Sequence, residues 1–122
     1  MIRRYLLTQP DSLLPTQQRI CLPVVQRLYN KMRAGIALPG IKVHDGFICD
    51  GHHRFIASGL AGASIDCYPG VLSTNHLKTT WDEMIIDEED WDTLQKIRML
   101  NEQDAAFNQM TLVELLELLS KI

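Results

Sequence analysis

A run of five residues that begins at Asp50, Asp-Gly-His-His-Arg, contains side chains able to bind an anion or to act on one. The guanidinium of Arg54 matches the geometry of a phosphate, and Asp50 could hold a magnesium ion or accept a proton. Gly51 permits a tight turn and the close approach of a ligand to the backbone. We therefore expect Asp50 and His53 to be catalytic, and we expect the phosphate or nucleotide to be bound by Gly51, His52, His53 and Arg54.

These residues need a strand that stops at Asp50 and a helix that starts directly after Gly51. The sequence predicts a strand over 47–50 and a helix over 52–62, which ends at a glycine. The first turn of a helix presents unpaired N–H groups and a partial positive charge, which suit an anion. A rotation of about 100° per residue puts four residues on the face expected to pack against the sheet: His53, Ile56, Ala57 and Leu60.

Structural roles would also account for these residue types. A histidine on an apolar helix face often hydrogen-bonds a carbonyl, and Arg54 could simply pair with Asp50. A zinc site is disfavoured because adjacent histidines on a helix diverge; its ligands would be His44, Cys49, His52 and His53. Nucleophilic catalysis by Cys49 is disfavoured because a thiolate forms reluctantly inside a buried strand.

The residues before the site predict a helix and a hairpin. The helix covers 22–35, with Pro23 at its start and a glycine at its end. The pair Asp45-Gly46 indicates a type I′ turn between strands at 40–44 and 47–50.

Two further strands, at 4–8 and 64–72, complete a small mixed sheet. In the second of these we expect three buried side chains, Ile65, Cys67 and Tyr68. The sequence therefore predicts an α+β fold, with an α+β core over 1–78 that carries the strand–turn–helix motif and a helical C-terminal extension over 79–122.

The extension is predicted to be helical from Thr79 to the end of the chain. Two capping boxes mark helix starts, Thr80 with Glu83 and Thr111 with Glu114. The last helix has an apolar stripe that would pack on its own domain or on a second copy in a homodimer: Leu112, Leu115, Leu116 and Leu119. The acidic segment 82–92 is a candidate surface for a protein partner.

Composition limits the classes of function. The chain has 122 residues with 46% hydrophobic and 22% charged residues, which is typical of a soluble globular domain. It has no apolar run of about 20 residues and no evident targeting signal, so we expect a cytoplasmic protein without a membrane contact. The net charge of −3 disfavours nucleic-acid binding, which depends on Lys and Arg to neutralise phosphates. Three widely spaced cysteines without a CxxC pair predict buried free thiols.

The stretch GHHRFIA, Gly51 to Ala57, resembles the G-x-x-R-x-x-A box of the ParB/sulfiredoxin-like superfamily. The order of elements over 1–72 is also similar. The resemblance implies that nucleotide phosphates, such as those of ATP, ADP or CTP with Mg²⁺, are held at the helix N-terminus. His53 and Arg54 would contact the phosphates, and Ala57 would be the small packing residue.

The sequence departs from the superfamily pattern at several positions, and these departures reduce the number of activities that the resemblance implies. The reactive cysteine of sulfiredoxins falls on His52, so sulfinic acid reduction is not expected. Partition proteins continue into a helix-turn-helix domain, whereas a short acidic, helical segment follows here. A kinase branch has an acidic residue before the turn glycine, which Asp50 matches, and Asp11 is the nearest candidate for its second carboxylate.

Three hypotheses follow. The first is a nucleotide- or phosphate-binding domain, with phosphotransferase or nucleotide hydrolase activity as an open question. The second is a non-catalytic protein that binds a partner, such as a bacterial toxin-immunity protein or antitoxin. The third is a DNA-associated ParB-like protein.

Overall fold

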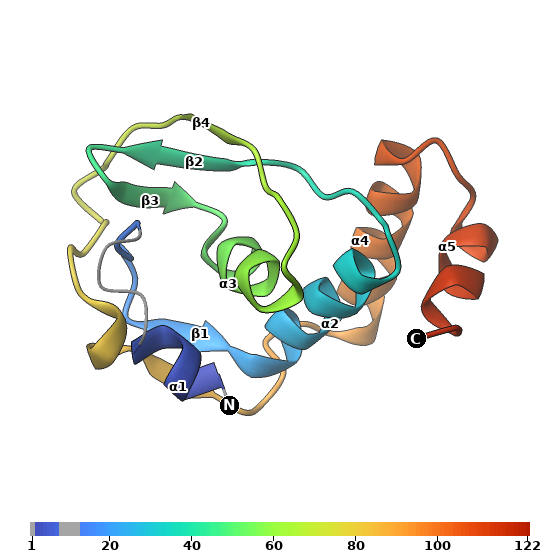
Figure 1. Cartoon of the computed structure of the whole chain (residues 1–122), viewed down its shortest axis with the longest axis horizontal. Coiled ribbons are helices and arrows are strands. Elements are labelled where there is room, and N and C mark those ends of the chain that lie inside the picture. The colour runs from blue at the N-terminus through green and yellow to red at the C-terminus, as the bar shows by residue number, and fades with distance from the viewer. Residues whose placement is uncertain (1, 8–12) are drawn as a thin grey trace.

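The fold combines helices with two small sheets, as the α+β prediction requires (Figure 1). The computed structural model describes residues 2–7 and 13–122. Its helices are α1 (Ile2–Leu7), α2 (Leu22–Arg33), α3 (His52–Ala61), α4 (Leu94–Phe107) and α5 (Leu112–Leu119), with a 3-10 turn, η1, at Trp81–Glu83. Its strands are β1 (Arg19–Cys21), β2 (Ile41–His44), β3 (Phe47–Asp50), β4 (Cys67–Pro69) and β5 (Ile85–Asp87).

The three-stranded sheet has the order β3-β2-β4 and is mixed. Strands β2 and β3 are antiparallel, and β4 runs parallel to β2. Asp45 and Gly46 join the hairpin with φ values of 48° and 79°, the positive pair that a type I′ turn needs. The predicted hairpin is therefore confirmed.

The second sheet is a parallel pair of β1 with β5, in which Ile20 lies opposite Ile86. The prediction of helix from Thr79 onward was wrong over this stretch, because η1 and β5 precede the first C-terminal helix. Thr80 makes no side-chain cap, so its capping box was also wrong. The reason is tertiary: β1 offers β5 backbone partners that a local pattern does not reveal.

The strand predicted at 4–8 was also wrong over its described part, which belongs to α1. Tyr5 and Leu6 follow Ile2 at helical spacing, and all three pack on the main core. Helix α1 also lies against η1. Packing on the core therefore favours a helix here over an isolated strand.

The main core lies around α3, which is placed between the three-stranded sheet and the β1–β5 pair (Figure 1). Ile56 and Ala57 of α3 are fully buried, as predicted from the helix rotation. The remaining buried members come from five other parts of the chain: Leu6, Ile20, Val25, Ile48, Trp81 and Met84.

Strand β4 exposes the side chains that we expected to be buried. Cys67 and Tyr68 are exposed and Ile65 is half-buried, so that prediction was wrong. Strand β4 lies at the edge of the three-stranded sheet. It has a neighbouring strand on one side only, which shields only part of it from solvent.

The C-terminal helices α4 and α5 form a second, smaller core with the loop after α2 (Figure 1). Its buried members are Ile36, Ala105 and Leu115. The capping box of Thr111 with Glu114 is confirmed. The stripe on α5 packs on its own chain through Leu115, while Leu116 is 46% exposed. Both this smaller core and the β1–β5 pair therefore join residues before position 78 to residues after it.

The longest of these helices, α4, has 14 residues. Within the described residues, none of the helices has the length and apolarity that a membrane crossing requires.

Candidate anion-binding site

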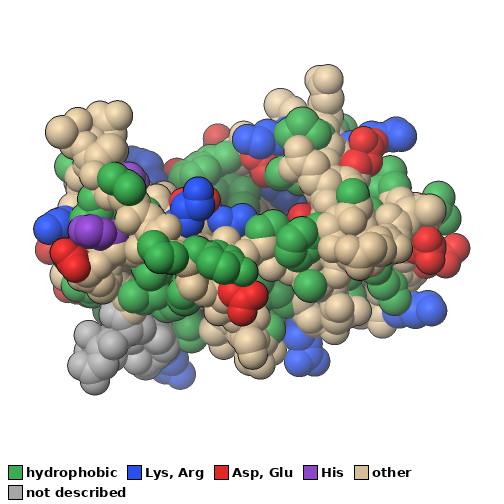
Figure 2. Space-filling view, turned by 90° about the horizontal axis from the view of Figure 1, so that it is seen from above, with side chains coloured by type: hydrophobic (Ala, Val, Ile, Leu, Met, Phe, Trp, Pro, Cys, Tyr) green, Lys and Arg blue, Asp and Glu red, His purple; other side chains and the backbone are tan. Residues whose placement is uncertain are grey.

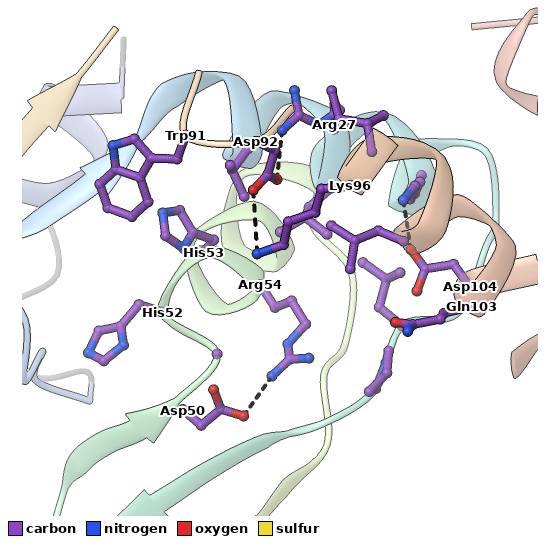
Figure 3. A pocket seen from close by; sticks show the side chains of 18 of the residues that line it. Arg27, Asp50, His52, His53, Arg54, Trp91, Asp92, Lys96, Gln103 and Asp104 are labelled. Atoms are coloured by element: carbon purple, nitrogen blue, oxygen red, sulfur yellow. Dashed lines mark hydrogen bonds and ion pairs between the residues drawn. The ribbon is translucent and has the colours of Figure 1, made fainter. Parts of the chain in front are cut away.

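A cavity of about 480 Å³ opens between the β3–α3 turn, α2 and α4. Figure 2 shows a hollow in the upper face of the molecule with lysine and arginine side chains in and beside it. The cavity is lined by every residue of the predicted site: Asp50, Gly51, His52, His53 and Arg54. Figure 3 shows the four of these that carry side chains on one side, and Gln103 and Asp104 of α4 on the other.

Gly51 shapes the entrance to α3. It is the N-cap residue with φ of 98°, and it provides no side chain to cap the helix. A Cβ atom at this position would lie 2.5 Å from Ile41 Cγ2 and 2.8 Å from the Arg54 Nη2 atom. Because Gly51 does not cap the helix, the first-turn N–H groups of α3 have no side-chain cap within the described part of the chain and are available to an anion in the cavity.

Replacing this glycine tests its structural role. Gly51→Ala is expected to destabilise the fold by about 2–3 kcal/mol, because alanine disfavours positive φ and its methyl group would overlap the buried Ile41. The matched control is Gly46→Ala, which also has positive φ but has open space around it and should cost about 1 kcal/mol. Urea denaturation measures both, and equal losses would contradict the close approach at Gly51.

His52 and His53 each accept a hydrogen bond from a backbone N–H group. His52 Nε2 accepts from Thr16 N at 2.9 Å, and His53 Nε2 accepts from Cys21 N at 2.9 Å. These partners are amides, not the carbonyls expected from the sequence. The two rings thereby tie the first turn of α3 to the chain around β1.

Both rings are neutral at physiological pH. Burial is the main cause that lowers the pKa of each to about 4; the neighbouring His53 lowers that of His52 further, and Asp92 opposes the shift at His53. Since Nε2 is the acceptor, the proton of each neutral ring sits on Nδ1. His53 can therefore reach a ligand only as an Nδ1–H donor.

The guanidinium of Arg54 has few hydrogen-bond partners among the described residues. Its Nη2 atom lies 3.3 Å from Asp50 Oδ2, and the Asp50 side chain is 68% exposed. Its Nε atom is buried and has no hydrogen-bond partner among residues 2–7 and 13–122. The pairing of Arg54 with Asp50 considered from the sequence is present, but it leaves part of the guanidinium free (Figure 3).

Ion pairs hold the far side of the cavity in place. Arg27 donates to both oxygens of Asp90, at 2.5 and 2.9 Å, and to Asp92 at 3.0 Å. Lys31, which is 4% exposed, pairs with Asp104 at 2.7 Å. Sequence reasoning missed these lining residues because their partners lie more than 60 positions away; the one local signal was the one-turn spacing of Arg27 and Lys31.

Several acidic side chains of the segment 82–92 form ion pairs with arginines of the same chain. Asp87 pairs with Arg19 at 2.6 Å, and the Arg27 hydrogen bond lowers the pKa of Asp90 to about 2. Glu88 and Glu89 are exposed, and their carboxylates form no ion pair within the part of the chain that is described.

No three histidine, cysteine or acidic side chains meet as a metal site within residues 2–7 and 13–122. The cysteines are free thiols, but only Cys21 is buried, whereas Cys49 is half-buried and Cys67 is exposed. Burial and the nearby Asp50 raise the pKa of Cys49. Asp11, the candidate second carboxylate, lies outside the described residues.

The site thus joins an uncapped helix N-terminus, a weakly satisfied arginine and a carboxylate at one cavity. No family model, curated protein or solved structure matches this chain, so the chemistry of the site rests on its own geometry.

Proposed function

We propose that the protein binds a phosphate group, as part of a nucleotide or a similar ligand, in the cavity at the N-terminus of α3. The observation that carries this proposal is Arg54: among the residues that the structure describes, its buried Nε has no partner and its one ion pair is a 3.3 Å contact with an exposed carboxylate. A buried unpaired donor is unfavourable, and a guanidinium that turned toward the cavity would offer this donor to a phosphate oxygen. The resemblance of GHHRFIA to the ParB/sulfiredoxin-like superfamily supports the same role.

In this proposal three kinds of donor converge on the phosphate. They are the Arg54 guanidinium, the free N–H groups of the first turn of α3 and the Nδ1–H of His53. Asp50 would be released from Arg54 and could then hold Mg²⁺ with the nucleotide. If the protein transfers or hydrolyses a phosphoryl group, Asp50 would orient the acceptor.

Substituting the arginine tests the proposal. Arg54→Ala is expected to weaken the binding of ATP, ADP, CTP or GTP by about 10- to 100-fold, since it removes charge-assisted hydrogen bonds. Arg54→Lys should lose less, because it keeps the charge without the fork. Calorimetry with and without Mg²⁺ is the measurement.

The control for this experiment is Arg98→Ala. Arg98 is exposed on α4, pairs with Glu102 and does not line the cavity, so its loss should leave binding unchanged. Absence of binding by the unmodified protein at millimolar nucleotide would refute the proposed function.

A second candidate function is partner binding without catalysis, as in an immunity protein or antitoxin. The exposed Glu88 and Glu89 favour it, because they remain free to meet a basic partner. Recovery of such a partner that survives Arg54→Ala but is lost on Glu88→Gln with Glu89→Gln would support it. The DNA-associated role stays a prediction, which a salt-dependent gel shift would test.

A further inference from the structure

The cavity is larger than a phosphate needs. At about 480 Å³ it falls in the range of roughly 300–1,000 Å³ typical of sites for small organic ligands. Arg54 and the N-terminus of α3 occupy one side only. A ligand that filled the cavity would therefore carry a body that extends from its phosphate toward α4.

Part of the cavity lining is apolar. This apolar surface comes from three parts of the chain: α2, the two residues before Gly40, and one stripe of α4. Its residues are Val24, Leu28, Leu38, Pro39, Ile97 and Leu100. Ile97 and Leu100 are spaced three residues apart, so they face the cavity from the same side of α4. Such a surface suits the faces of an uncharged, flat group.

Two side-chain amides lie on the α4 side of the cavity, Asn101 and Gln103. Figure 3 shows Gln103 across the cavity from Asp50 and His52. Neither amide makes a side-chain hydrogen bond to any described residue. The neighbouring Asp104 is fixed by the buried Lys31, so the amides are presented from a part of α4 that is held in place.

An amide side chain is both a donor and an acceptor. It can pair with the edge of a nucleobase, as Asn and Gln do with adenine. Phosphate alone would leave these groups and the apolar surface unused. A nucleoside phosphate uses all three parts of the cavity, because it joins a charged end, a flat ring and a hydrogen-bonding edge.

We propose that the ligand is a nucleoside phosphate whose base lies against the apolar surface and is recognised by Asn101 and Gln103 of α4. This inference rests on the proposed phosphate-binding function and assigns base recognition to the C-terminal segment, outside the residues that carry the superfamily resemblance. The phosphate lies at Arg54, on the opposite side of the cavity.

Comparison of nucleotides with a baseless polyphosphate tests the assignment. Calorimetry at fixed Mg²⁺ would measure ATP, CTP, GTP, UTP and inorganic tripolyphosphate. The unmodified protein should bind at least one nucleotide about tenfold or more tightly than tripolyphosphate. The double variant Asn101→Leu with Gln103→Met keeps the side-chain shapes and should lose this preference, while its affinity for tripolyphosphate stays unchanged.

Unchanged tripolyphosphate binding also shows that the double variant is folded. The matched control is Gln95→Met, on α4 but outside the cavity, which should keep the preference. Tripolyphosphate binding without any nucleotide preference would overturn the base assignment and leave the phosphate site standing. A preference that survives the double variant would also overturn it, whereas failure of every ligand to bind would refute the phosphate site itself.

Discussion

Acidification from about pH 7 to pH 4 is expected to destabilise the fold through His52 and His53. Burial lowers the pKa of both from 6.5 to about 4, so between these values the unfolded chain binds more protons than the folded one. The free energy of unfolding therefore falls as the pH falls through this window. The loss is on the order of 3 kcal/mol for each histidine, and protonation of Nε2 would also break its hydrogen bond to Thr16 or Cys21.

Urea denaturation as a function of pH measures this effect. His52→Gln and His53→Gln retain an acceptor for the backbone amide but do not titrate, so each should flatten the pH dependence between 6.5 and 4. His44→Gln is the matched control, because the His44 side chain is 48% exposed and makes no buried contact of this kind. A stability that is level across the window in the unmodified protein would contradict the neutral, buried state of the two rings.

Removal of one partner from the Lys31–Asp104 pair is expected to cost about 3–5 kcal/mol, the range for an ion left buried without its counter-charge. Lys31 is 4% exposed and Asp104 14% exposed, with 2.7 Å between Nζ and Oδ2. The pair joins α2 to α4, so Lys31→Ala and Asp104→Ala should also loosen the wall of the cavity.

The joint substitution Lys31→Met with Asp104→Leu separates charge from packing. Replacing both partners with apolar side chains should recover most of the lost stability. The exposed pair Arg98–Glu102 on α4 is the control, and Arg98→Ala should cost only about 0.5 kcal/mol. Chemical denaturation midpoints measure all four proteins. A double variant no more stable than either single one would show that the packing of these side chains, not their charge, holds α4.

The elements predicted correctly are those whose signals are local. The Asp45-Gly46 turn is set by two residues that tolerate positive φ, and the box at Thr111 depends on a partner three residues away. Helix α3 follows from a glycine at each end and from the helical spacing of His53, Ile56, Ala57 and Leu60. Each of these choices is made within a few residues, so the chain sequence by itself determined them.

The elements that were missed depend on partners far along the chain. The pairing of β1 with β5 joins Ile20 to Ile86, and a helix at the N-terminus is favoured because Leu6 enters the main core. Strand β4 has a strand pattern, yet its position at the sheet edge exposes Tyr68. Burial and pairing of this kind are decided by packing, not by local preference.

The candidate site divides in the same way. The sequence by itself determined that Asp50, Gly51 and Arg54 stand at the start of a helix, because turn and helix signals meet there. Only the tertiary structure decided that burial keeps the two histidines neutral, that Thr16 and Cys21 donate hydrogen bonds to them, and that α4 closes a cavity opposite Arg54. The reason is that burial and long-range contacts, which set pKa values and cavity walls, arise only when distant segments pack together.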